Sequence, residues 1–312
     1  MTVVVGIAPG HPSVAAVHLG ALLARSYAQP LVLAAVTPAG WTPGGGGVDG
    51  EYLRYLEAAA AEAIAGVREE CASALDDLEV RSVIRSASSA RRGLLEVCED
   101  ARAVRLVLGE AGEPGDGADD GIVLGSVGIG LLQSAELPVA IAPHGYVAEP
   151  GARLERITAA YNGSDTSGEL VLAAAAVAAE AGASVRIASF HPRPRGLLGA
   201  AIGFAAEDAV IAEWESLIRE RAATLECEID GRAPRPSAVE LVVGAGKDWR
   251  AALRAIPWGP AEVLLLGSSS AGALARISLG SHAAKIVRHA PAPVVFVPRR
   301  AADGYVEQGS GS

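Results

Sequence analysis

The chain has 312 residues, half of them hydrophobic and only 4% aromatic, and carries a formal charge of −10. This length is enough for two domains of ordinary size, whose cores have to be built mainly from aliphatic side chains. The negative charge argues against a nucleic-acid partner, because binding to a phosphate backbone depends on Lys and Arg. No apolar run reaches the roughly 18 residues that a membrane-spanning helix needs.

The first half alternates apolar runs with helical patterns. Residues 2–8 form a continuous apolar run, which is typical of a strand buried on both faces of a parallel sheet. Further strands are expected at 31–36, 80–84, 104–108 and 138–143. Helical patterns are expected between them, at 13–28, 51–78, 86–100 and 125–135.

The same order of elements returns in the second half. Strands are expected at 156–161, 185–190, 239–243, 263–266 and 294–297, and helices at 170–181, 206–223, 249–256 and 281–292. Two helix starts carry capping signals. Thr166 with Glu169 three residues later suggests a capping box, and Asp248 is expected to cap the helix that follows it.

The two halves align at an offset of about 154 residues, which indicates a tandem duplication. Ala8 then corresponds to Asn162, Gly125 to Gly280, and Pro138 to Pro293. Strands that alternate with helices predict an α/β protein with two tandem, doubly wound parallel sheets. We expect domains over 1–147 and 152–299, followed by a disordered tail over 300–312.

One stretch of the second half suits a phosphate. The apolar run 263–266 stops at Gly267, a loop of small polar residues follows, and Gly280-Ser281 opens a helix. The first amides of a helix have no internal partners and the helix dipole is positive there. Ligands of parallel α/β sheets bind beyond the carboxyl ends of the strands, where Gly267, Asn162 and Phe190 are expected to lie.

With these motifs the chain resembles the universal stress protein family, in particular its tandem two-domain members. The family signature is G-x2-G-x9-G-[S/T]. Gly267 and Gly280-Ser281 keep its spacing, with Ser270 at the second glycine position. The resemblance covers nearly the whole chain. It implies Rossmann-like domains of the adenine nucleotide alpha hydrolase-like kind, each with five parallel strands.

Some members of that family bind ATP. In those members an Asp after the first strand holds the ribose, the end of the second strand contacts adenine, and the glycine loop and Gly-Ser amides hold the phosphates. The resemblance implies that the corresponding residues here are Asn162, Phe190, Gly267, Ser270, Gly280, Ser281 and His282. Asn162 lacks the carboxylate charge, and the Cβ of Ser270 restricts close approach of a phosphate. We expect Mg²⁺ only together with ATP.

The first half is a weaker candidate for the same site. Ala8 offers no side chain to a ribose, and no Lys or Arg lies between Arg105 and Arg153. The weaker candidate residues are Gly109, Gly112, Gly125, Ser126 and Val127. The interval after Gly112 is longer than in the family signature. The intervening acidic residues are expected to be solvated, and they do not match a calcium loop; they are Glu110, Glu113, Asp116, Asp119 and Asp120.

No catalytic constellation is evident. The sequence lacks a Walker loop and a GxSxG nucleophile elbow, and its histidines lack metal-ligand spacing. We therefore expect a protein that is not an enzyme, with slow ATP hydrolysis left open. Two functions remain: a stress-response protein that binds ATP as a regulatory ligand in its second domain, or a nucleotide-free interaction or scaffold module.

Further expectations concern location and assembly. Cys71, Cys98 and Cys227 are widely spaced and are expected to be buried, reduced thiols of a cytoplasmic protein. The family resemblance implies pairing through the last strands, 139–142 and 294–297. This pairing would form either within one chain or between two copies in a homodimer.

Overall fold

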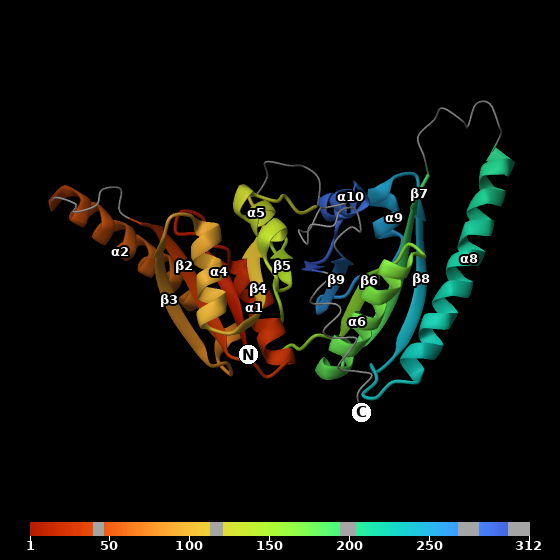
Figure 1. Cartoon of the computed structure of the whole chain (residues 1–312), viewed down its shortest axis with the longest axis horizontal. Coiled ribbons are helices and arrows are strands. Elements are labelled where there is room, and N and C mark those ends of the chain that lie inside the picture. Colours follow the sequence, from red (N-terminus) through yellow and green to blue (C-terminus); the bar gives the residue numbers. More distant parts are fainter. Residues whose placement is uncertain (40–46, 113–120, 194–203, 268–280, 299–312) are drawn as a thin grey trace. The chain divides into compact units, whose positions relative to one another are not determined.

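The computed structural model describes residues 1–39, 47–112, 121–193, 204–267 and 281–298. The chain divides into two compact units, with a boundary between Arg153 and Leu154 (Figure 1). Each unit is described by itself. Among the described residues, no helix combines the length and apolar character needed to cross a bilayer.

Unit 1 is a parallel sheet with the strand order β3-β2-β1-β4-β5. Its strands are β1 (Thr2–Ile7), β2 (Leu31–Pro38), β3 (Val80–Ala87), β4 (Ala103–Gly109) and β5 (Val139–Ala142). Its helices are α1 (Val14–Ser26), α2 (Gly47–Glu70), α3 (Ala72–Leu75), α4 (Ala90–Asp100) and α5 (Ser126–Ser134). Helices α1, α2 and α3 contact one another, and α4 contacts α5, so the sheet lies between two helical layers.

Unit 2 repeats this topology in the order β8-β7-β6-β9-β10. Its strands are β6 (Arg156–Ala160), β7 (Ser184–Pro192), β8 (Val239–Gly246), β9 (Glu262–Gly267) and β10 (Val294–Val297). Its helices are α6 (Asp165–Ala181), α8 (Phe204–Asp230), α9 (Trp249–Arg254) and α10 (Ser281–His289). The predicted fold class and the duplication are confirmed, because both units have the same strand order with parallel pairing throughout.

The central strand of each unit shows why the parallel sheet was predictable. Val3, Val4 and Val5 of β1 are fully buried, as a strand covered by helices on both faces requires. Ile157 and Ala159 occupy the same place in β6 and are also buried. A run of buried residues therefore marks the centre of each sheet, and it is continuously aliphatic in β1 but includes Thr158 in β6.

Several element ends differ from the sequence prediction. The helix predicted over 51–78 is divided into α2 and α3, and α8 is longer than the predicted 206–223. Strand β3 continues to Ala87, because it pairs with β2 along the whole length of that strand. The predicted capping box at Thr166 is wrong. Ser164 is the N-cap of α6, and its hydroxyl accepts a hydrogen bond from the Ser167 amide at 3.3 Å.

Two other local predictions have different outcomes. Asp248 caps α9 as predicted, accepting a hydrogen bond from the Ala251 amide at 2.9 Å. Of the three cysteines predicted to be buried, Cys227 is exposed on α8. Burial raises the pKa of Cys71 to about 11 and that of Cys98 to about 12, so both buried thiols remain protonated and unreactive at neutral pH.

The segment after β5 is hydrogen-bonded to unit 1 through the buried side chain of Arg25. Arg25, at the end of α1, donates from Nη1 to the Ala152 carbonyl at 3.0 Å. Its Nε and Nη2 bind the two carboxylate oxygens of Asp77 at 2.7 and 2.6 Å, and this contact lowers the pKa of Asp77. Arg153 donates to the Ser26 carbonyl at 3.4 Å. The segment up to Arg153 therefore belongs structurally to unit 1.

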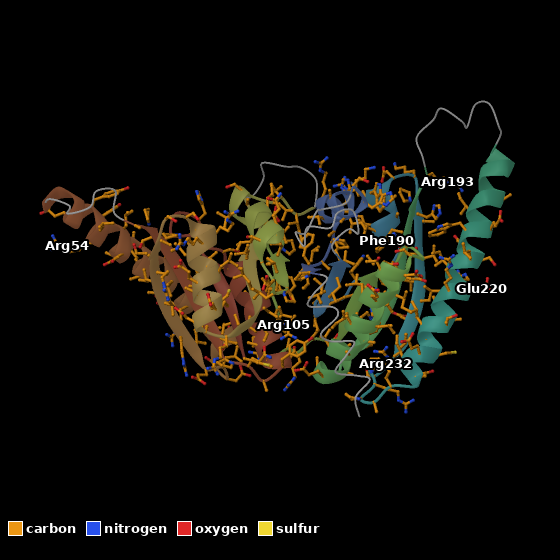
Figure 2. The ribbon with its side chains drawn as sticks, in the orientation of Figure 1. Arg54, Arg105, Phe190, Arg193, Glu220 and Arg232 are labelled. Atoms are coloured by element: carbon orange, nitrogen blue, oxygen red, sulfur yellow. The ribbon has the colours of Figure 1, made fainter. Side chains whose placement is uncertain are left out.

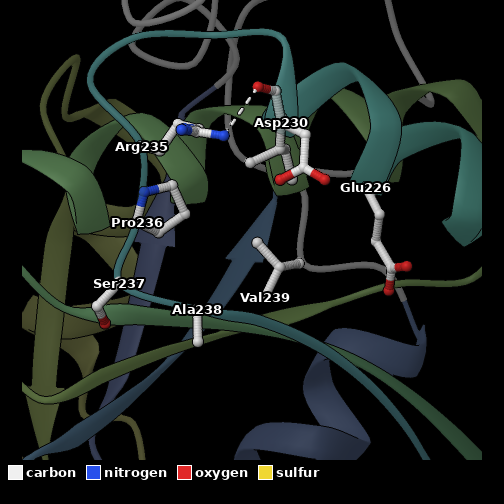
Figure 3. Close-up of a pocket in the computed structure, with 8 residues that line it drawn as sticks. Glu226, Asp230, Arg235, Pro236, Ser237, Ala238 and Val239 are labelled. Carbon is white, nitrogen blue, oxygen red and sulfur yellow. Dashed lines mark hydrogen bonds between the residues drawn. The ribbon is translucent and has the colours of Figure 1, made fainter.

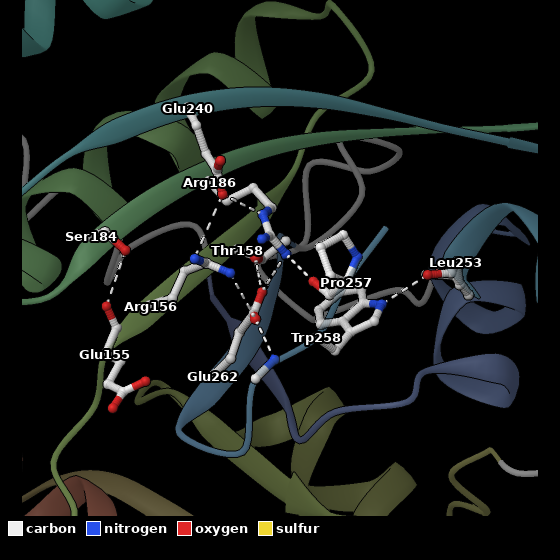
Figure 4. Close-up of polar contacts among 11 residues, drawn as sticks. Glu155, Arg156, Thr158, Ser184, Arg186, Glu240, Leu253, Pro257, Trp258 and Glu262 are labelled. Atoms are coloured by element: carbon white, nitrogen blue, oxygen red, sulfur yellow. Dashed lines mark hydrogen bonds and ion pairs between the residues drawn. The ribbon is translucent and has the colours of Figure 1, made fainter. Parts of the chain in front are cut away.

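Unit 2 contains a buried ionic cluster near the amino ends of its strands (Figure 4). The carboxylate of Glu262, 1% exposed, accepts hydrogen bonds from Arg186 Nη1 at 3.0 Å, from the Gly259 amide at 2.9 Å and from the Thr158 hydroxyl. Arg186, 2% exposed, also donates to the Pro257 carbonyl at 2.7 Å. The pair thereby joins β6, β7 and the loop before β9.

Removing one partner of this cluster should destabilise unit 2 strongly. We expect Arg186→Met to lower the free energy of unfolding by about 3–5 kcal/mol, because Glu262 would lose its buried cation and keep only the partly exposed Arg156, whose Nη1 atom lies 3.5 Å away. Denaturant unfolding followed by the fluorescence of Trp214, Trp249 and Trp258, all in unit 2, measures the change.

The matched control removes an exposed arginine from the same unit. Arg219 lies 4.0 Å from Glu215 and its side chain is 58% exposed, so Arg219→Met should cost less than about 1 kcal/mol. Equal losses of unfolding free energy in Arg186→Met and Arg219→Met would show that burial does not set the contribution of the Arg186–Glu262 pair to stability.

Candidate functional site

The carboxyl edge of unit 2 begins with a tight turn after β6. The side-chain oxygen of Asn162 accepts hydrogen bonds from the Ser164 amide at 3.0 Å, the Ser164 hydroxyl at 2.7 Å and the Ser167 hydroxyl at 2.8 Å. Gly163 supplies the positive φ of 82° that the turn needs, and its carbonyl accepts from Arg221 of α8. The Asn162 oxygen thus builds the turn, and its amide nitrogen is the group left for a ligand.

Phe190, near the end of β7, packs onto one face of the sheet. Figure 2 labels its side chain. The Phe190 ring is stacked on that of Trp258, with centroids 6.5 Å apart and an interplanar angle of 15°. On the same side, a Cβ atom built on Gly244 of β8 would lie 3.1 Å from the Phe190 ring. The aromatic ring predicted to contact adenine is therefore in contact with the layer of α9.

The next residue of β7, His191, points the other way and was not among the predicted site residues. The His191 ring meets the Trp214 ring of α8 edge-on, with centroids 3.8 Å apart. Burial lowers the pKa of His191, and the nearby Glu215 carboxylate partly opposes this effect. Successive strand residues face opposite sides of a sheet, so the alternation at Phe190-His191 was the available signal.

The phosphate half of the predicted site lies on β9 and α10. Gly267 is the last residue of β9, which pairs with β6, so Gly267 and Asn162 lie at the same edge of the sheet. Ser270 and Gly280 lie outside the described residues. Helix α10 begins at Ser281 with no acidic residue in its first turn. Ser281 and His282 are exposed there, and the His282 ring lies 5.4 Å from that of Trp249.

The weaker candidate residues of unit 1 also gather at one carboxyl edge. Gly109 ends β4, and a Cβ atom there would collide with Ser13, the N-cap of α1. Gly125 is the N-cap of α5, where Ser126 is exposed and Val127 is half-buried. Gly112 has a φ of 104°, which suits only glycine. The structure thus places the five residues on the loop and helix start that the sequence predicted.

The first acidic residue of this loop is buried, contrary to the predicted solvated loop. The Glu110 side chain is 7% exposed. Its carboxylate accepts hydrogen bonds from the His144 amide at 2.8 Å and the Val123 amide at 3.4 Å. The His144 Nε2 atom in turn donates to the Gly112 carbonyl at 3.1 Å. The other four acidic residues lie outside the described residues.

A groove of about 400 Å³ lies elsewhere on unit 2, where α8 ends and β8 begins (Figure 3). Arg235 reaches across it to the Asp230 carbonyl at 3.4 Å. The groove is at the amino end of β8, whereas ligands of parallel sheets bind at the carboxyl ends. Within the part of the chain that the structure describes, no cluster of His, Cys, Asp and Glu is arranged to hold a metal ion.

Fold and site together define a class. Each unit is a Rossmann-like parallel sheet in which the strand beside the central one ends in glycine, with a helix start at the same carboxyl edge. The model of the universal stress protein family matches residues 1–143 and 153–298. The chain belongs to the universal stress protein family, with two tandem domains.

Known relatives agree with this assignment. Universal stress proteins of Mycobacterium tuberculosis (strain ATCC 25618 / H37Rv) and Mycobacterium bovis are 33% identical over 299 residues, which cover 96% of this chain and 100% of each relative. A universal stress protein structure from Archaeoglobus fulgidus has a TM-score of 0.54 at 17% identity, covering 95% of this chain and 98% of that one. A functionally unknown protein from Pseudomonas aeruginosa PAO1 has a TM-score of 0.51 at 15% identity, covering 100% and 97%. The two structures show the fold alone.

The environment of His191 predicts a pH dependence of stability. Because folding lowers the pKa of His191, the unfolded chain binds the proton more readily as pH falls below about 6.5. This contribution to stability is complete above that pH and is lost as pH falls through the lowered folded-state pKa. We expect the unfolding free energy of unit 2 to fall between pH 7.5 and 5 less steeply in His191→Gln. Urea unfolding at several pH values measures this, and equal slopes would refute the prediction.

Proposed function

We propose that this protein is a cytoplasmic stress-response regulator that binds ATP in unit 2 as a regulatory ligand, without turning it over. The observation that carries the proposal is the arrangement at the carboxyl edge of unit 2. Two neighbouring parallel strands end there, β6 two residues before Asn162 and β9 at Gly267, and α10 begins with Ser281. The amides at a helix start suit phosphate, and no acidic side chain of the first turn of α10 opposes it.

The described residues fit a nucleotide in part. Ser281 and His282 would hold phosphate through the amides of the first turn, and the Asn162 amide nitrogen would donate to a ribose hydroxyl. Bound ATP would bring Mg²⁺ with it to balance the phosphate charge. His191 and Trp214 add aromatic surface near the end of β7. These groups bind and orient, and none of them is placed as a general base.

A second candidate function is a nucleotide-free interaction module. Two observations favour it: the Asn162 oxygen is already used by the turn, and the Phe190 ring is stacked on Trp258. Pairing through the last strands, β5 and β10, stays a prediction in either case. Light scattering coupled to size-exclusion chromatography would distinguish a monomer from a homodimer.

Nucleotide content and thermal stability test the main proposal. We expect purified protein to release ATP on denaturation, and ATP at about 100 times its Kd to stabilise the protein by about 2.7 kcal/mol. Gly280→Val should abolish the stabilisation, because a branched side chain blocks approach to the helix start, whereas Gly125→Val in unit 1 should leave it intact. Protein without nucleotide and without any ATP-dependent shift would favour the interaction module. Equal loss in both variants would contradict the choice of unit 2.

Restoring the family's carboxylate should strengthen binding. In Asn162→Asp one carboxylate oxygen can keep the turn while the other accepts from a ribose hydroxyl. A hydrogen bond to a charged group contributes about 1.5–3 kcal/mol, so we expect ATP affinity to rise about tenfold or more. Isothermal titration calorimetry measures the change, with Asn162→Ala as the comparison. Unchanged affinity in Asn162→Asp would show that this position does not face the ribose.

A further inference from the structure

A buried carboxylate distinguishes the carboxyl edge of unit 1 from that of unit 2. Glu110 directly follows Gly109, the last residue of β4. The corresponding position in unit 2 follows Gly267, the last residue of β9, and the sequence has Ser268 there. The two copies of the glycine motif therefore differ in charge at the first residue of the loop.

The carboxylate is fixed in place by the chain around it. The Glu110 amide donates to the Ala142 carbonyl at 3.0 Å, which extends the pairing of β4 with β5. Its carboxylate accepts from the His144 and Val123 amides, and the side chain is 7% exposed. Amides that could have faced an anionic ligand are thus occupied by a side chain of the protein itself.

The loop that carries Glu110 supplies no Lys or Arg to offset its carboxylate. The sequence has no Lys or Arg between Arg105 and Arg153. The His144 ring lies 3.9 Å from Glu110 Oε1, but its Nε2 atom donates to the Gly112 carbonyl. A fixed negative charge in a poorly solvated position repels a polyphosphate more strongly than a solvated one does, because the local dielectric screening is weaker.

We propose that Glu110 is a specificity-determining residue, which makes unit 1 select against nucleotides and other polyanions. This inference rests on the proposed function, in which unit 2 takes the nucleotide. Glu110 acts in two ways: it places a negative charge beside the glycine motif at the carboxyl edge, and it occupies the Val123 and His144 amides. The single duplication would then have yielded one nucleotide site and one site closed to polyanions.

The test converts unit 1 toward unit 2 in two steps. Ala8→Asn supplies the ribose-facing residue of unit 2 but keeps the carboxylate, and Ala8→Asn with Glu110→Ser also removes it. Comparing these two full-length variants isolates Glu110 from the missing ribose contact. Equilibrium dialysis with radiolabelled ATP gives the number of nucleotides bound per chain. Glu99→Gln, on the exposed side of α4, is the matched control for loss of a negative charge.

We expect about one nucleotide per chain for the wild type, for Ala8→Asn and for Glu99→Gln, and about two for the double variant. Affinity at the new site should exceed that of Ala8→Asn at unit 1 at least tenfold. The proposal would be overturned if Ala8→Asn alone bound a second nucleotide. It would also be overturned if a folded double variant bound no second nucleotide. If Glu110→Ser impairs folding, as judged by melting temperature, Glu110→Gln removes the charge while keeping an acceptor.

Nucleotide binding by the wild-type protein tests the proposed function of unit 2 separately. Wild-type protein that binds no nucleotide would refute the proposed function, whatever unit 1 does. The inference about Glu110 is still decided in that case, because the double variant and Ala8→Asn differ only at this residue. One bound nucleotide in the double variant and none in Ala8→Asn would support it, and none in either would refute it.

Discussion

Both units depend on one constraint: a parallel sheet whose central strand is buried on both faces. β1 is almost wholly aliphatic and β6 buries Ile157, Thr158 and Ala159, so helices have to cover each face. Parallel neighbours can be joined only by crossovers, and these crossovers place every strand's carboxyl end at the same edge. The turn at Asn162, the end of β9 at Gly267 and the start of α10 share an edge for this reason.

The two duplicated units share this backbone but place charged side chains at different positions. Unit 2 has Arg186 within its sheet, paired with Glu262, and the register-equivalent residue of unit 1 is Val32 in β2. Unit 1 instead buries the Glu110 side chain, at the opposite ends of its strands. Strand order tolerates such exchanges because it depends on the aliphatic pattern, whereas ligand preference depends on individual charges at the edge.

Much of the fold could be predicted, and the limits have physical reasons. Apolar runs and an internal repeat predicted the strands and their parallel pairing, and the glycine motif predicted Gly267 at a strand end. The cap of α6 was misplaced because Ser164 and Thr166 both suit an N-cap, and the Asn162 turn decides between them. Burial of Glu110 depends on amides of Val123 and His144, which are distant in sequence, so no local pattern revealed it.

The attachment of Arg25 to Ala152 has an evolutionary consequence. When two copies of a gene fuse, the segment between them starts as a tether under little constraint. Here that segment has become part of the first domain, because the Ala152 carbonyl accepts a hydrogen bond from the Arg25 guanidinium, which also binds Asp77. A separate first domain would therefore have to keep this segment, because a chain cut at the end of β5 would lose the acceptor of one donor of the buried Arg25 guanidinium.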